Sequence, residues 1–184
     1  MAFFLDKQRE MLLLLLLLLM LLILSPPLIQ ADLNLIKTLC RNSDTPATCM
    51  KCVTSSENAL VLNSVGIATS LVDCTDDQAK ILGASMEELA TNSSNDTRKP
   101  IYQTCANDYR RNIPPFLVSA KFSLREHNYE AAEYYVLKAR RLDLYCHRDI
   151  ESYKDEVQDE VYFNMTRFEE FADSACRIIE KIYA

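Results

Sequence analysis

The sequence has almost no glycine: two residues in 184. Two glycines cannot build the loops that cradle phosphate groups, and no GxGxxG, P-loop, GxSxG or HExxH motif occurs. Histidine is nearly as rare, because only His127 and His147 are present and both lie among polar residues. The sequence therefore nominates no catalytic residue and no set of metal ligands, and we expect neither enzyme activity nor a cofactor.

Clusters of basic residues are also missing. The formal net charge is −6, whereas binding to nucleic acid requires Lys and Arg gathered on one surface. The pairs Arg110-Arg111 and Arg140-Arg141 stand alone on mixed helical faces, and we interpret them as solvated surface. We expect no nucleic-acid partner.

The one long apolar run covers residues 11–24 and follows the basic residues Lys7 and Arg9. Its 14 residues fall short of the roughly 20 that a membrane-spanning helix needs. Ser25-Pro26-Pro27 ends the run, and Ala31 offers a small residue for cleavage. We predict a secretory signal peptide over residues 1–31, a mature domain over residues 32–184, and no membrane association after cleavage.

Cysteine is present seven times, always after the predicted leader. Secretion makes disulfides chemically reasonable, and an odd count leaves at least one thiol free or paired between molecules. Sequons begin at Asn92, Asn95 and Asn164, which are candidate glycosylation sites of a secreted protein.

The chain has no strong strand runs, and its apolar residues recur at helical spacing. Stripes with steps of three and four residues run through residues 65–89, 102–124, 132–146 and 161–179. Each helix could bury its stripe only against the others, which predicts an all-α, up-down-up-down four-helix bundle over residues 60–184. Pro114 and Pro115 interrupt the second stripe, and we expect them to push Ile113 out of the helical region and to kink or divide that helix.

The remaining segment, residues 32–59, predicts a helical hairpin ahead of the bundle, closed by Cys40 and Cys49. Cys105 and Cys146 lie on two stripes predicted to face each other, so a disulfide between them is geometrically natural. Cys49-Met50-Lys51-Cys52 matches CxxC, but no βαβ pattern surrounds it and no second pair follows. We therefore interpret Cys52 as a separate thiol.

Three groups of residues resemble the plant invertase and pectin methylesterase inhibitor family. The first is an Ile and a Cys ahead of a Thr-x-x-x-Cys turn, the second a Cys four residues before an aromatic residue, and the third a Tyr-x-x-Ala pattern that leads to a Cys. In this chain they are Ile36, Cys40, Thr45, Pro46 and Cys49; Ile101, Cys105 and Tyr109; and Tyr129, Ala132, Ala139 and Cys146.

The resemblance implies a disulfide-stapled four-helix bundle with an N-terminal hairpin, paired as Cys40–Cys49 and Cys105–Cys146. It also implies a non-catalytic inhibitor that covers the active site of an acid invertase or a pectin methylesterase in the apoplast, with the vacuole as the alternative compartment. A non-inhibitory helical interaction module on the same scaffold is the alternative function.

Invertase inhibitors of the family can present a Pro-Lys-Phe segment at the turn between the second and third bundle helices. Its counterpart here is His127-Asn128-Tyr129, of which only the aromatic residue matches. These three residues are the predicted partner-binding site. Cys52, Cys74 and Cys176 lie outside the family's pairing, and a Cys74–Cys176 bridge is out of register by about two helical turns.

Overall fold

The computed structural model describes residues 26–56, 59–94, 97–153 and 157–184. Most of the predicted leader, residues 1–25, lies outside the described residues, and the predicted cleavage point after Ala31 falls within the first described helix. No strand occurs in the described ranges, so the all-α expectation is confirmed. The elements are α2 (Pro26–Cys40), α3 (Pro46–Thr54), η1 (Ala59–Val61), α4 (Ser64–Asn92), α5 (Lys99–Asn107), η2 (Asp108–Asn112), α6 (Ile113–Arg125), α7 (Tyr129–Glu151) and α8 (Asp159–Tyr183).

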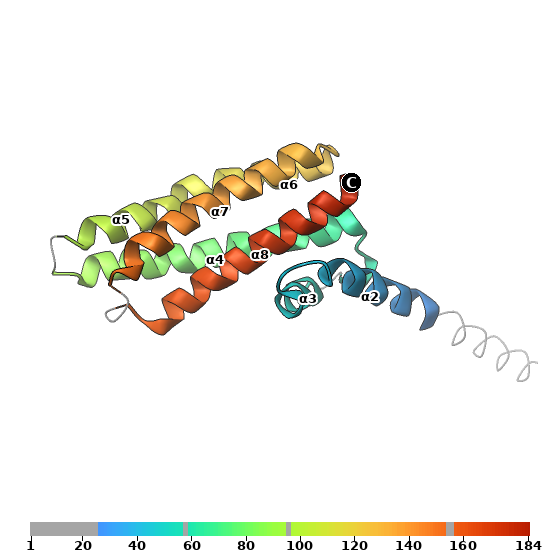
Figure 1. The fold of residues 1–184 in the computed structure, drawn as a ribbon, viewed down its shortest axis with the longest axis horizontal. Coiled ribbons are helices and arrows are strands. Elements are labelled where there is room, and N and C mark those ends of the chain that lie inside the picture. Colours follow the sequence, from blue (N-terminus) through green and yellow to red (C-terminus); the bar gives the residue numbers. More distant parts are fainter. Residues whose placement is uncertain (1–25, 57–58, 95–96, 154–156) are drawn as a thin grey trace, which may run out of the picture.

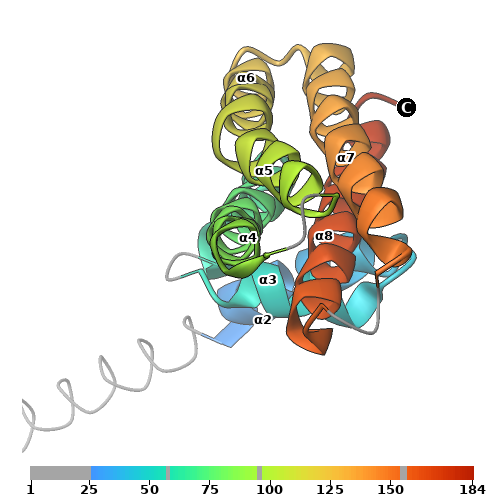
Figure 2. The ribbon, with the colours of Figure 1, turned by 90° about the vertical axis from the view of Figure 1, so that its left-hand side faces the viewer.

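The long helices form the predicted four-helix bundle (Figures 1 and 2). One layer consists of α7 and the continuous rod α5–η2–α6, and the other consists of α4 and α8. The hairpin of α2 and α3 lies against α4 and α8, on the side away from the first layer. Each helix thus buries its apolar stripe against the others, which places a single core along the bundle axis.

The burial pattern follows three of the predicted stripes closely and the fourth less so. Every predicted residue of the α8 stripe is buried. In α7 the buried stripe instead includes Val136 and Asp143, whereas the predicted Tyr135 and Leu142 are only half-buried beside it. The predicted stripe of α7 was thus wrong by one residue at two positions, and at one of them the sequence offers a carboxylic acid, Asp143, as the core residue.

The second bundle helix divides where prolines were expected to interrupt it, but Ile113 was predicted wrongly. Its φ of −70° and ψ of −49° are helical. The five residues of η2 form a π turn, in which the backbone N–H of Ile113 donates to the carbonyl of Asp108. Pro114 and Pro115 fall in the first turn of α6, directly after this π turn. The π turn removes the need for Ile113 to leave the helix.

The hairpin is fastened to the bundle by polar contacts with α8. The hydroxyl of Thr48 donates to Glu170 Oε2 at 2.7 Å, and Arg177 lies 3.9 Å from Asp44. Buried residues of the hairpin, including Ile36 and Val53, join the core of the bundle. The hairpin is therefore packed on the helices rather than merely tethered to them.

Candidate functional site

The turn between α6 and α7 holds the three predicted partner-binding residues. His127 is exposed, and its φ of 57° is the only positive φ of a non-glycine residue in the described segments. The side chain of Asn128 accepts a hydrogen bond from the N–H of Ala131 at 3.2 Å and thereby caps α7. The hydroxyl of Tyr129 lies 2.8 Å from His127 Nδ1, while its ring packs half-buried against the core. Of these three side chains, only that of His127 is exposed and neither caps a helix nor packs against the core.

Exposed apolar side chains lie on both helices that this turn joins. Val118 and Phe122 on α6 and Tyr134 and Leu137 on α7 are four of the ten large hydrophobic residues that are exposed in the described part of the chain. Two of the rings carry cations: Arg125 lies over Phe122 and Lys138 over Tyr134, at 5.7 and 5.2 Å from the ring centres. We call the exposed surface of residues 118–138 the α6–α7 tip. Aromatic residues flanked by Arg are typical of protein interfaces.

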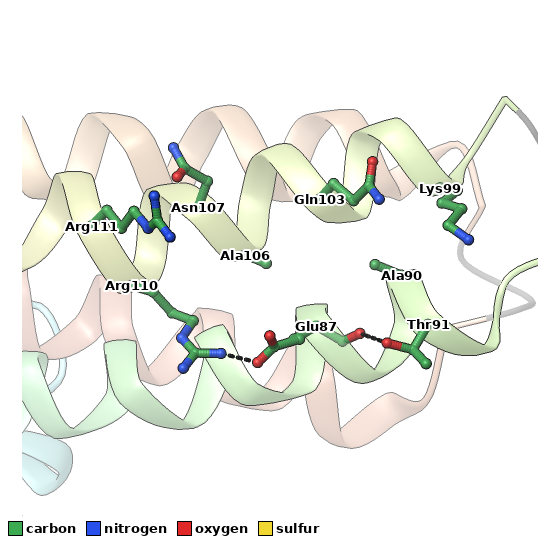
Figure 3. A pocket seen from close by; sticks show the side chains of 9 residues that line it. All are labelled: Glu87, Ala90, Thr91, Lys99, Gln103, Ala106, Asn107, Arg110 and Arg111. Atoms are coloured by element: carbon green, nitrogen blue, oxygen red, sulfur yellow. Dashed lines mark hydrogen bonds and ion pairs between the residues drawn. The ribbon is translucent and has the colours of Figure 1, made fainter.

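A polar groove lies at the opposite end of the bundle, between α4 and the α5–η2 segment (Figure 3). Its volume is about 850 Å³. We call it the basic groove, and its lining residues are Glu87, Ala90, Thr91, Lys99, Gln103, Ala106, Asn107, Arg110 and Arg111. Arg110 is ion-paired with Glu87 across it.

A buried polar pair crosses the bundle core. The hydroxyl of Tyr109, in the π turn, donates to Asp143 Oδ1 on α7 at 2.6 Å, and both side chains are almost wholly buried. The ring of Tyr109 also meets Phe168 of α8 edge to face. Burial raises the pKa of Asp143 well above its usual value, and it raises the pKa of Tyr109 as well. Tyr109 was predicted as part of a stripe, but Asp143 was missed, because sequence periodicity ranks a carboxylate as surface.

Further polar residues extend from this pair to the flank of the bundle. The carboxyl of Glu169 lies near that of Asp143, and it further favours a proton on Asp143. Glu169 Oε1 also lies 2.7 Å from Nδ1 of His147, whose ring leans on Tyr162. One histidine of the sequence is thus engaged in a structural network, which leaves His127 as the exposed one.

The cysteines form three disulfides. Cys40 pairs with Cys49 and Cys105 with Cys146, the two pairs that the family resemblance implies. The interpretation of Cys52 as a separate thiol was wrong, because Cys52 is bonded to Cys74 with their Cα atoms 6.2 Å apart. The two residues lie on different helices, α3 and α4, and only the packing of the hairpin on the bundle brings them together.

The one free cysteine is Cys176 on α8. It is buried, and burial raises the pKa of its thiol to about 12. The thiolate is the reactive form of cysteine, so this side chain is a packing residue rather than a nucleophile.

Other site classes leave no trace in the described residues. No group of three or more His, Cys, Asp or Glu side chains is placed to hold a metal ion there. None of the described helices is long and apolar enough to cross a membrane. Of the sequon residues, Asn92 is exposed at the end of α4 and Asn164 is partly exposed on α8, whereas Asn95 lies outside the described residues.

A bundle of four long helices preceded by a disulfide-closed helical hairpin is a recognisable architecture among solved structures. No model of a known protein family matches the sequence, and no curated protein matches it. The structure is similar to the crystal structure of mutant form A of a pectin methylesterase inhibitor from Arabidopsis, with a TM-score of 0.68 and 18% identity over 79% of this chain and 95% of that one.

It is also similar to the crystal structure of a pectin methylesterase inhibitor from Arabidopsis thaliana, with a TM-score of 0.60 and 18% identity over 79% of this chain and 93% of that one. Both are inhibitors of an enzyme rather than enzymes. The chain therefore has the fold of these inhibitors, as the family resemblance implied.

Proposed function

We propose that this protein is a secreted inhibitor that covers the active site of a plant pectin methylesterase, with acid invertase as the alternative target. The shared fold supports an inhibitor, and both similar structures are inhibitors of pectin methylesterase. The predicted leader and the three disulfides favour secretion to the apoplast. Glycosylation at the exposed sequons belongs to the same proposal.

The observation that carries the proposal is the concentration of exposed apolar residues at the α6–α7 tip. A soluble surface rarely keeps several large apolar side chains together unless a partner covers them. The tip stands on α6 and α7, which pack against each other within the bundle, so little ordering entropy is lost on docking.

The turn residues have separate roles in this proposal. His127 is presented toward the partner, Tyr129 fixes the orientation of the imidazole through its hydroxyl, and Asn128 holds the start of α7. Tyr129→Phe keeps the half-buried ring and removes only the hydrogen bond to His127. We expect this substitution to weaken inhibition severalfold, and unchanged potency would exclude an oriented His127 from the interface.

The first experiment adds the purified protein to assays of pectin methylesterase and of acid invertase at several pH values. Loss of rate in one assay identifies the target. No effect on either enzyme at micromolar protein contradicts the inhibitor and leaves the non-inhibitory interaction module.

The second experiment tests the surface with a matched pair of substitutions. Phe122→Ser changes an aromatic residue of the tip that is 55% exposed, and Phe163→Ser changes one on α8 that is 58% exposed. Each ring lies under an arginine, but Phe163 is near the start of α8, away from the α6–α7 turn. We expect Phe122→Ser to weaken inhibition at least tenfold, as loss of an aromatic anchor does, and Phe163→Ser to leave it unchanged. Equal effects of the two substitutions would contradict docking through the tip.

A further inference from the structure

The basic groove has a net positive charge, whereas the chain as a whole is acidic. Three cations line it, Lys99, Arg110 and Arg111, against the single carboxylate of Glu87. The formal net charge of the whole chain is −6, so the groove is a local reversal of sign. An anionic ligand would be attracted here and repelled by most other surfaces.

Two of the three cations have no counter-ion among the described residues. Arg110 is paired with Glu87, but no described residue forms an ion pair or a hydrogen bond with the side chain of Lys99 or of Arg111. The carboxamides of Gln103 and Asn107, between them on the same wall, are likewise without a partner in the described part of the chain. The groove therefore offers unused donors along its whole length.

The π turn helps to keep Arg111 in line with the other residues of this wall. Lys99, Gln103, Asn107 and Arg111 follow one another at steps of four residues. On a regular α-helix of 3.6 residues per turn such a row drifts around the helix, whereas a π turn holds one more residue and reduces the drift. The row then spans about 18 Å, which is twelve residues at about 1.5 Å each.

Gly83 allows this wall to lie close to α4. A Cβ atom at Gly83 would come within 2.7 Å of Arg110 Cγ and 3.4 Å of Tyr109 Cβ. Gly83, one of the two glycines of the chain, thus permits the close contact between α4 and Arg110 at the end of the groove.

We propose that the basic groove binds an acidic oligosaccharide, one whose sugar units carry carboxylates. Lys99 and Arg111 pair with carboxylates at the two ends of the row, and arginine can do so through two parallel hydrogen bonds. Gln103 and Asn107 donate to and accept from hydroxyl groups between them. This site is separate from the α6–α7 tip, and it does not depend on the inhibitory function.

The lining favours a sugar chain over an acidic peptide. Apart from the partly or wholly buried Ala90 and Ala106, every residue of the groove is polar or charged. Peptide recognition relies on apolar anchors that fill pockets, and this groove offers none. A uronate chain needs only carboxylate and hydroxyl partners, which are the groups present.

The test is isothermal titration of the full chain with hexagalacturonate at low salt. Two further probes are an uncharged hexasaccharide and hexaglutamate. We expect hexagalacturonate to bind, the uncharged sugar to bind at least tenfold more weakly, and the affinity to fall as salt screens the charges. Binding of hexaglutamate with equal or higher affinity would assign the groove to acidic peptides and overturn the proposal, as would no binding of hexagalacturonate.

Substitutions locate the site, and all of them change exposed side chains that the fold does not need. Arg111→Gln should weaken hexagalacturonate binding at least tenfold, and Glu87→Gln should strengthen it severalfold by releasing Arg110. Arg141→Gln, which removes an exposed arginine from α7, is the matched control and should have no effect. Equal losses in Arg111→Gln and Arg141→Gln would show general attraction to charge and would reject the groove.

Discussion

The buried carboxyl of Asp143 should make the bundle less stable as the pH rises. Its pKa in the folded protein is well above the usual 3.8, because it is buried and its neighbour Glu169 favours a proton on it. The folded state therefore keeps a proton that the unfolded chain releases above about pH 4. Since the folded state binds more protons there, the free energy of unfolding declines with pH until the folded pKa is reached.

The variant Asp143→Asn isolates this contribution. The amide resembles the protonated carboxyl: Oδ1 still accepts from Tyr109 at the position of the present 2.6 Å bond, and the amide N–H can donate to Glu169. Unlike the carboxyl, the amide of Asn does not titrate. The stability of the variant minus that of the wild type should therefore grow by up to about 1.4 kcal/mol for each pH unit above about pH 4, the linkage value for one proton.

The assay is guanidinium unfolding of both proteins, with disulfides intact, at pH 4, 5, 6 and 7. Taking the difference between the two proteins removes the contributions of other carboxyls, such as Asp173, whose pKa burial also raises. Asp149→Asn, which removes a carboxyl from an exposed position of the same helix, is the control. A difference between Asp143→Asn and wild type that stays constant from pH 4 to 7 would refute a protonated Asp143.

Substitutions at three other places test a buried hydrogen bond, a disulfide and a helix cap. Tyr109→Phe leaves Asp143 Oδ1 buried without a donor, and we expect it to lower the free energy of unfolding by about 1–3 kcal/mol. A loss below the lower end of this range would mean that water replaces the hydroxyl. Cys52→Ser with Cys74→Ser opens a loop of sequence separation 22 and should cost about 3 kcal/mol in the same assay, whereas an unchanged midpoint would contradict the bridge. Asn128→Ala removes the cap of α7 and should cost about 1 kcal/mol, while Asn128→Asp should keep the cap; equal losses would argue against capping.

Much of the fold was predictable because helical periodicity is a local property. The stripes of α4 and α8 were identified from apolar spacing alone, and the structure buries them. Pro114 and Pro115 marked the division of the second bundle helix. The conformation of Ile113 was missed, because the choice between leaving the helix and forming a π turn depends on how η2 packs against α4 and α7.

The candidate sites were less predictable, because they are built from residues on different helices. The sequence singled out the turn at His127, but it could not show that Asn128 caps a helix and that Tyr129 is half-buried. It presented Arg110-Arg111 as solvated surface. Only the approach of α5 and η2 to α4 joins that pair with Lys99 in one groove.

The sequence by itself determined an all-helical chain with a predicted leader, a hairpin and four amphipathic helices, since each of these follows from residues within a few turns of one another. Tertiary structure decided that Cys52 meets Cys74, that Asp143 meets Tyr109, and that the chain presents a tip and a groove. Those outcomes depend on how far each helix is rotated and shifted against its neighbours. The burial of the whole core sets that geometry, and a local pattern does not contain it.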